Sequence, residues 1–143
     1  MNHMTHHQKE LVLTSFTRIV PIAEETGELF FSRLFEIAPY ARPLFKEDLT
    51  VQGRRFMLSL AMVVHNLDSM ESITPMLQKL GRDHRSYGVT TGYYDIGASA
   101  LLWTLERCLG GDFTDEVRNS WISLYTLVSG IMKKAAEDVS LAA

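Results

Sequence analysis

One histidine lies in line with an apolar stripe near the end of a predicted helix. Leu77, Leu80, His84 and Tyr87 are spaced by three or four residues, so they share one face of a helix that stops at Gly88. An imidazole on such a face needs a partner, because an unpaired buried polar group costs on the order of 1–3 kcal/mol. His84 is therefore either a core histidine bonded to a backbone carbonyl, the more frequent case, or a metal ligand.

Other side chains could surround a flat, apolar ligand that carries iron. Gln52 stands one turn ahead of Phe56 on the apolar face of an earlier predicted helix. Arg55, just outside that face, could pair with an anionic substituent of the ligand. Aromatic and aliphatic walls would come from Phe31, Phe45, Phe56, Val89 and Ile96. Each residue alone is better explained as core or surface, and their joint occurrence is what favours a cofactor site.

Motifs of the common hydrolases and transferases are absent from the sequence. There is no P-loop, no GxSxG elbow and no His-Glu-x-x-His. The single cysteine, Cys108, excludes an intrachain disulfide, suits a reducing compartment and is expected to be a small buried hydrophobe. Asp83 and His84 are not a catalytic pair, because neighbours on a helix point about 100° apart.

Length and composition predict one soluble domain. The 143 residues are 46% hydrophobic, which is enough for a core without disulfides. The net charge of -3 is small and no long basic run is present, so nucleic acid is not an expected partner. The first residues, Met1 to Glu10, contain no apolar segment of signal-peptide length, and no run reaches the roughly 18 apolar residues of a membrane span. We therefore expect a cytoplasmic protein without a membrane partner.

Helical periodicity dominates the chain, and strand alternation is nowhere sustained. Helices are predicted over about 5–20, 21–37, 50–67, 75–87 and 93–109, with a short turn-like helix at 40–45 and a last helix after Thr114. Thr50 and Thr114 are the predicted caps, Pro75 is predicted to open its helix, and Gly27 offers a place for close helix approach. The pattern indicates an all-α domain at 9–138, with a disordered tail at 1–8 and another tail at 139–143.

These segments resemble the globin family over about residues 10–137. Residues 80–89, which read Leu-Gly-Arg-Asp-His-Arg-Ser-Tyr-Gly-Val, are similar to the proximal segment of that family. Pro39 followed six residues later by Phe45 matches its corner proline and haem-stacking phenylalanine. Residues 29–35 look like its second helix, and residues 105–114 look like the junction before its last helix. The chain is most similar to bacterial single-domain globins of the neuroglobin-like and flavohaemoglobin types, which implies a 3-over-3 helical sandwich around a haem pocket.

The resemblance implies haem b (iron protoporphyrin IX) as cofactor and a role for each matching residue. His84 would bind the iron, and its other ring nitrogen would donate to a backbone carbonyl near Leu80. Gln52 would face the sixth coordination site. Phe45 would stack on the porphyrin, Phe31 would cap the distal pocket and Arg55 would meet a haem propionate. The other expected haem contacts are Phe56 and Ile96 on the distal walls, Tyr93 on the proximal side, Leu80 and Val89.

Three positions depart from the family's better-known branches. Phe31 stands where many bacterial globins and flavohaemoglobins carry a tyrosine, so Gln52 would be the obvious distal donor and oxygen release should be faster. Ala136 stands where flavohaemoglobins place a glutamate, with Glu137 one residue on. Neuroglobins use a distal histidine as a sixth iron ligand, and because Gln52 takes that place, the same internal ligation is not expected.

Three functions are compatible with the sequence. The first is reversible binding of oxygen and other diatomic ligands (NO and CO), for oxygen binding or transport. The second is an enzyme, a nitric oxide dioxygenase that takes electrons from a separate reductase; a haem redox or ligand sensor is a variant of the first. The third is a haem-free globin-fold interaction module, which His84, Phe45 and Gln52 argue against. A non-enzymatic oxygen-binding protein is the favoured prediction.

Overall fold

The computed structural model describes residues 4–142, with side chains as far as Asp138, and this part of the chain is helical without a strand. The α-helices are α1 (His6–Ile19), α2 (Ala23–Ile37), α3 (Leu49–Val64), α4 (Met70–Ser86), α5 (Thr91–Leu109) and α6 (Asp115–Ala142). Short 3-10 segments lie at η1 (Val20–Ile22), η2 (Pro39–Leu44) and η3 (Gly110–Asp112). The prediction of an all-α fold is confirmed. No helix among these residues is long and apolar enough to cross a bilayer.

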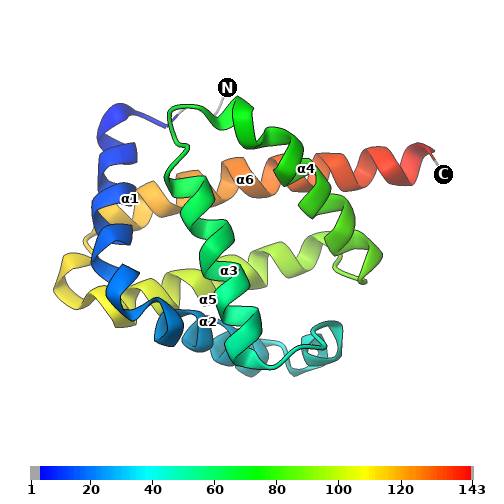
Figure 1. Cartoon of the computed structure of the whole chain (residues 1–143), viewed down its shortest axis with the longest axis horizontal. Helices are drawn as coiled ribbons and strands as arrows, with labels where there is room; N and C mark the ends of the chain where they lie inside the picture. The colour runs from blue at the N-terminus through cyan, green and yellow to red at the C-terminus, as the bar shows by residue number, and fades with distance from the viewer. Residues whose placement is uncertain (1–3, 143) are drawn as a thin grey trace.

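The helices form two crossed layers. In Figure 1, α1, α3 and α4 run across α2, α5 and α6, which is the predicted 3-over-3 arrangement. The most extensive packing joins α2 to α3, α4 to α6, α2 to α5 and α1 to α6. The core lies between the layers, where Val12, Phe16, Ile19 and Trp121 are almost completely buried. The indole Nε1 of Trp121 donates to Ser15 Oγ at 2.9 Å and so satisfies its own polar group.

Glycines on both helices allow a close crossing of α2 and α3. A Cβ atom added at Gly27 would lie 2.6 Å from the carbonyl oxygen of Gly53, and one added at Gly53 would lie 2.8 Å from the carbonyl carbon of Gly27. The close approach expected at Gly27 is confirmed. Because no side chain fits between the two backbones, this crossing fixes α3 relative to α2.

The first and last helices extend into the tails expected at 1–8 and 139–143. Thr5 Oγ1 accepts from Gln8 N at 3.1 Å and Gln8 Oε1 accepts from Thr5 N at 3.0 Å, so a capping box starts α1 at His6. Residues 6–8 of the tail expected at 1–8 therefore belong to a helix. At the other end the α6 backbone stays helical to Ala142, through most of the tail expected at 139–143. Residues 1–3 and 143 lie outside the described residues.

Two helix starts differ from the prediction, and a third agrees. Asp48 rather than Thr50 caps α3, since Asp48 Oδ1 accepts from Val51 N at 2.9 Å. Pro75 does not open α4, which begins at Met70 and continues through the proline. Pro75 has no N–H, so α4 lacks one backbone hydrogen bond, the one to the carbonyl oxygen of Glu71. Glu71 is exposed in the first turn of the helix. Thr114 caps α6 as predicted, its Oγ1 accepting from Val117 N at 3.3 Å.

Candidate functional site

His84 lies in the last turn of α4, with one ring nitrogen bonded and the other open. Nδ1 is 2.7 Å from the carbonyl oxygen of Leu80, and because a carbonyl only accepts, Nδ1 carries the proton. The expected hydrogen bond is therefore present. Within the described residues no hydrogen bond reaches Nε2, and Nε2 is not among the buried polar atoms that lack a partner. The lone pair of Nε2 thus faces accessible space, as a metal ligand requires.

The chain turns sharply after His84 and folds back beside it. Tyr87 does not extend the buried stripe, because the helix has ended and its side chain is 65% exposed. Gly88 has a φ of 97°, a left-handed conformation that glycine adopts without strain. The N–H of Val89 then donates to the carbonyl oxygen of His84 at 2.9 Å. The turn brings Val89 back beside His84, and a Cβ atom at Gly88 would lie 3.3 Å from Leu44 Cδ2 at the end of η2.

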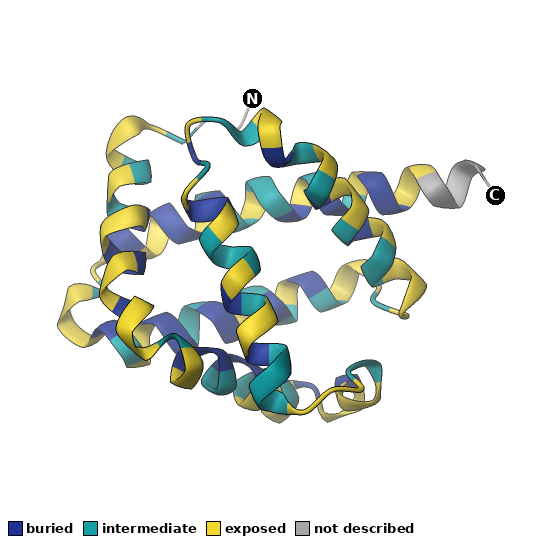
Figure 2. Cartoon of the chain, in the orientation of Figure 1, coloured by how far each residue is buried: buried dark blue, intermediate teal, exposed yellow. Residues whose placement is uncertain are grey.

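We place the candidate site in the region between α3 and α4, which we call the opening. These two helices are not among the pairs that pack on one another, although the helices beside them do. The apolar side chains that surround the opening are half-buried, and they pack against the closed core without joining it. Figure 2 shows half-buried segments along both helices. The half-buried apolar residues of this region are Phe45, Phe56, Leu60, Leu80, Val89 and Ile96. Apolar surface left in water costs roughly 25 cal/mol per Å2, so this region suits an apolar ligand.

Five phenylalanine rings form one cluster on the α3 side of the opening. Phe31 is buried and contacts all four others, with ring centroids 5.0 Å from Phe30, 6.0 Å from Phe35, 5.2 Å from Phe45 and 6.1 Å from Phe56. Phe30 and Phe56 are stacked, 4.0 Å apart and 4° from parallel. Phe30 and Phe35 belong to this cluster but are not among the predicted site residues. The sequence signal that could have identified them is their position relative to Phe31: Phe30 directly precedes it, and Phe35 follows it by four residues, about one helical turn.

Gln52 is half-buried, and its amide takes part in no hydrogen bond within the described chain. It lies one turn before Phe56 on a face of α3 that points away from Thr50 and Arg54. Those two residues fasten the helix to α2: Thr50 Oγ1 donates to Glu28 Oε1 at 2.8 Å, and Arg54 Nη2 donates to Glu24 Oε1 at 3.2 Å. The helix is held on one side, and the Gln52 amide remains free to meet a ligand on the other.

The comparisons with known proteins identify the family. The family model described as Globin matches residues 28–132. The chain belongs to the globin family. Neuroglobin-1 of Oncorhynchus mykiss is 28% identical to this globin, and a neuroglobin of Dissostichus mawsoni is 29% identical; each match covers 94% of this chain and 93% of the relative.

Two solved structures share the fold of this globin. A hexacoordinated heme protein from an anhydrobiotic tardigrade superposes with a TM-score of 0.85 and 16% identity, covering 94% of this chain and 96% of that one. An engineered carbene transferase, derived from a Rhodothermus marinus protein proposed to be a nitric oxide dioxygenase, superposes with a TM-score of 0.88 and 17% identity, covering 97% of both. Globins hold haem, and the open Nε2 of His84 above an apolar opening fits that cofactor.

The outer members of the predicted site lie at its edges. Arg55 is exposed, and its Nη2 is 3.4 Å from Glu47 Oε1, so it does not line the opening. A propionate would have to share that guanidinium with Glu47. Tyr93 is half-buried at the start of α5, with its ring centroid 5.8 Å from that of the exposed Tyr40.

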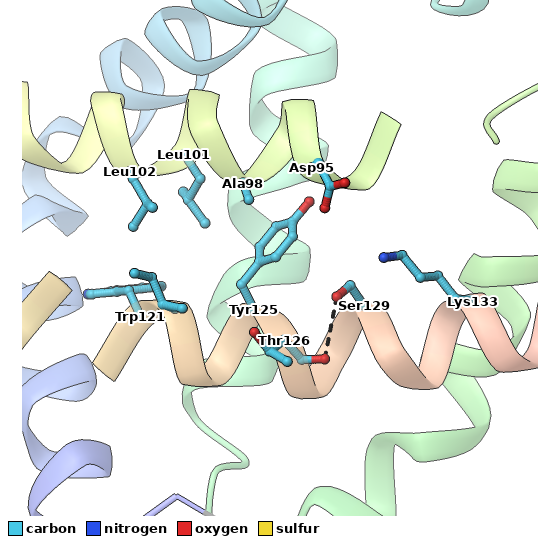
Figure 3. Close-up of a pocket in the computed structure, with 10 residues that line it drawn as sticks. Asp95, Ala98, Leu101, Leu102, Trp121, Tyr125, Thr126, Ser129 and Lys133 are labelled. Atoms are coloured by element: carbon cyan, nitrogen blue, oxygen red, sulfur yellow. Dashed lines mark hydrogen bonds between the residues drawn. The ribbon is translucent and has the colours of Figure 1, made fainter. Parts of the chain in front are cut away.

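Two cavities lie away from the opening. One of about 210 Å3 lies between α5 and α6 (Figure 3), where Tyr125 points from α6 towards α5 beside Asp95. The Tyr125 hydroxyl donates to the carbonyl oxygen of Tyr94 at 2.6 Å, and burial raises the pKa of Tyr125 far above its usual value. A second cavity of about 310 Å3 is lined by Val89 and by no other residue of the predicted site. Neither contains His84 or Gln52, so we place the site at the opening, where an unshared nitrogen meets apolar walls.

Proposed function

We propose that this globin binds haem b between α3 and α4, with His84 Nε2 as the proximal iron ligand, and that it reversibly binds oxygen and other diatomic gases. The observation that carries this proposal is one imidazole with one nitrogen bonded and the other open. Nδ1 donates to Leu80 at 2.7 Å, which fixes the ring's tautomer and orientation, while Nε2 has no partner among the described residues. When bound, haem supplies an iron whose sixth position can take a small gas molecule.

The apolar walls would hold the macrocycle and exclude water. Phe45 lies at the end of η2, where Phe31 and Phe35 hold its ring at centroid distances of 5.2 and 5.5 Å. It would stack on the porphyrin. Leu80 and Val89 would line the proximal side together with Tyr93, and Phe56 and Ile96 the distal side. Burying these half-exposed side chains against a flat apolar ligand would add stability through the hydrophobic effect.

Gln52 would act as the distal hydrogen-bond donor. Its side-chain amide is unengaged, and Phe31, which has no polar atom, occupies the adjacent cluster. One hydrogen bond to a polarised ligand is worth roughly 1–3 kcal/mol, or a factor of about 5 to 150 in affinity. Lacking a second donor from position 31, this globin should release oxygen faster than a variant with a tyrosine there.

Nitric oxide dioxygenation is the second candidate. The apolar cluster around Phe31 favours it, because a dry distal pocket would shelter a reactive oxygen ligand, and the Rhodothermus marinus structure shares this fold. The reaction consumes electrons, which a separate reductase would supply. A redox or ligand sensor would instead couple the haem state to a partner. All three functions suit a reducing cytoplasm, as does the unpaired Cys108.

Absorption spectra of the purified protein in its ferric, ferrous and ferrous-CO forms test the proposal. We expect an intense Soret band and a five-coordinate ferrous spectrum in the wild type. His84→Ala should lose the haem or its normal spectrum, whereas His65→Ala, which removes an exposed histidine at the end of α3, should keep both. Absence of haem uptake by the wild type would contradict the proposal and leave a globin-fold interaction module.

A further inference from the structure

Basic side chains are concentrated on the parts of the chain that border the opening. Residues 39–55 and 84–94 together hold five basic and two acidic side chains, a formal charge of +3. The whole chain has 14 basic and 17 acidic residues, so the remainder holds nine and 15, a formal charge of −6. The two segments meet in space, because Leu44 Cδ2 lies 3.3 Å from the position of a Cβ atom on Gly88. These two segments are therefore positive and the remainder of the chain is negative, a charge separation that we call the dipole.

Exposed tyrosines accompany these charges. Tyr40 is 62% exposed and Tyr87 is 65% exposed, the first on η2 and the second at the end of α4. We call the surface formed by Tyr40, Arg42, Lys46, Arg55 and Tyr87 the mouth rim. Tyrosine and arginine are enriched in protein–protein interfaces, where tyrosine supplies large contact area at low entropic cost. The composition of the rim is that of a docking surface.

The mouth rim touches the walls of the proposed haem site directly. The guanidinium of Arg42 lies 5.1 Å from the ring centroid of Phe35, and its Nη1 donates to the carbonyl oxygen of Phe45 at 3.5 Å. Tyr40 packs on Tyr93 with ring centroids 5.8 Å apart. These contacts connect the mouth rim to Phe45 and Tyr93, two residues of the proposed haem site.

Four of the seven charges on these segments have a capping role or an ion-pair partner. Asp48 caps α3, Glu47 pairs with Arg55, and Arg54 pairs with Glu24 of α2. Arg85 lies on the far side of the turn, beside the cavity that Val89 lines. Among the described ion pairs none involves Arg42 or Lys46, so their charges are uncompensated by a neighbouring carboxylate. Two haem propionates would lower the local charge without reversing the dipole.

We propose that the mouth rim docks an acidic electron-donor protein that reduces the haem iron. The proposal rests on the haem site proposed above. One electron leaves the donor's reduced cofactor, which is oxidised by one electron, and ferric iron accepts it to become ferrous. An acidic partner is repelled by the remainder of the molecule and attracted by Arg42 and Lys46, so it meets the opening first. The exposed rings of Tyr40 and Tyr87 then bury apolar area in the complex.

Two charge-matched variants of the haem-loaded protein test this surface. Lys46→Glu and Lys134→Glu each change the net charge by the same amount, but Lys134 is an exposed residue of α6, outside the two positive segments. The probe is a reduced flavodoxin with an acidic surface, and the measured quantity is the rate of haem reduction. At about 10 mM ionic strength we expect Lys46→Glu to slow reduction about three- to ten-fold and Lys134→Glu to change it less than about twofold. At about 0.5 M the difference should disappear.

With a cationic reductant, hexaammineruthenium(II), we expect Lys46→Glu to have the opposite effect on the rate of haem reduction. Lys46→Glu should speed reduction by this complex, because the rim is then less positive, while Tyr40→Ala should slow only the protein donor. Equal rates for the two lysine variants with flavodoxin would overturn the docking proposal. The haem spectrum, recorded first, separates the failures: a normal spectrum with equal rates contradicts the docking surface alone, and a missing haem contradicts the proposed function and the docking surface with it.

Discussion

Phe31 contacts four other phenylalanine rings, including Phe56, which follows Gln52 by one turn of α3. A hydroxyl at this position would add a second donor to the distal side. Phe31→Tyr is expected to slow oxygen dissociation about 5- to 150-fold, the range given by one hydrogen bond of roughly 1–3 kcal/mol. Stopped-flow measurement of the oxygen off-rate checks this.

The matched control for that substitution is Phe35→Tyr, the same chemical change in the same cluster. Phe35 is half-buried, and its ring contacts Phe31, Phe45 and the guanidinium of Arg42 without contacting Phe56 among the described ring pairs. The off-rate should change little there. An unchanged off-rate in Phe31→Tyr would show that the pocket gains nothing from a donor at this position.

At the scale of helices, the crossing of α2 and α3 sets the position of Gln52. Gly53→Ala would place a Cβ atom 2.8 Å from the backbone of Gly27, and overpacking of this kind typically costs about 1–3 kcal/mol. Gly130→Ala is the control, because that α6 glycine has no atom within 4 Å of its added Cβ and should gain about 0.5–1 kcal/mol from helix propensity. Urea unfolding measures both. Equal stability of the two variants would contradict the close crossing.

The order and type of these helices could be predicted from periodicity, and so could His84 as the polar member of an apolar stripe. The starts of α3 and α4 could not be predicted in this way. Asp48 and Thr50 are both good caps, and the choice depended on Glu28 of another helix, which engages Thr50 at 2.8 Å. The roles of Phe30 and Phe35 also escaped prediction, because ring contacts depend on the angle at which two helices cross. Arg55 was placed on the correct helix, but its ion pair with Glu47 could not be read from spacing.

At the scale of the whole molecule, Tyr94 and Tyr125 link the start of α5 to α6. They should make the free energy of unfolding decrease at alkaline pH. Burial raises the pKa of Tyr94, and burial followed by the charges of Tyr94 and Asp95 raises that of Tyr125. The folded state therefore keeps phenolic protons that the unfolded chain releases above about pH 10. The free energy of unfolding should be constant below that pH and then fall, by at most about 1.4 kcal/mol per pH unit for each tyrosine.

Chemical denaturation between about pH 8 and pH 11.5 measures this dependence. Tyr125→Phe should be less stable at neutral pH, because the carbonyl of Tyr94 loses its donor at 2.6 Å, and its alkaline decline should be shallower. An alkaline slope as steep in Tyr125→Phe as in the wild type would assign the dependence to other groups.

The central claim is that His84 Nε2 binds the haem iron while Nδ1 donates to Leu80. Resonance Raman spectroscopy of the ferrous protein tests it most directly, through the iron–histidine stretching band in the wild type and in His84→Gly with and without added imidazole. We predict that the band is present in the wild type, absent in His84→Gly, and replaced by an iron–imidazole band when imidazole fills the space. An iron–histidine band that persists in His84→Gly without imidazole would contradict the account, because another histidine would then hold the iron.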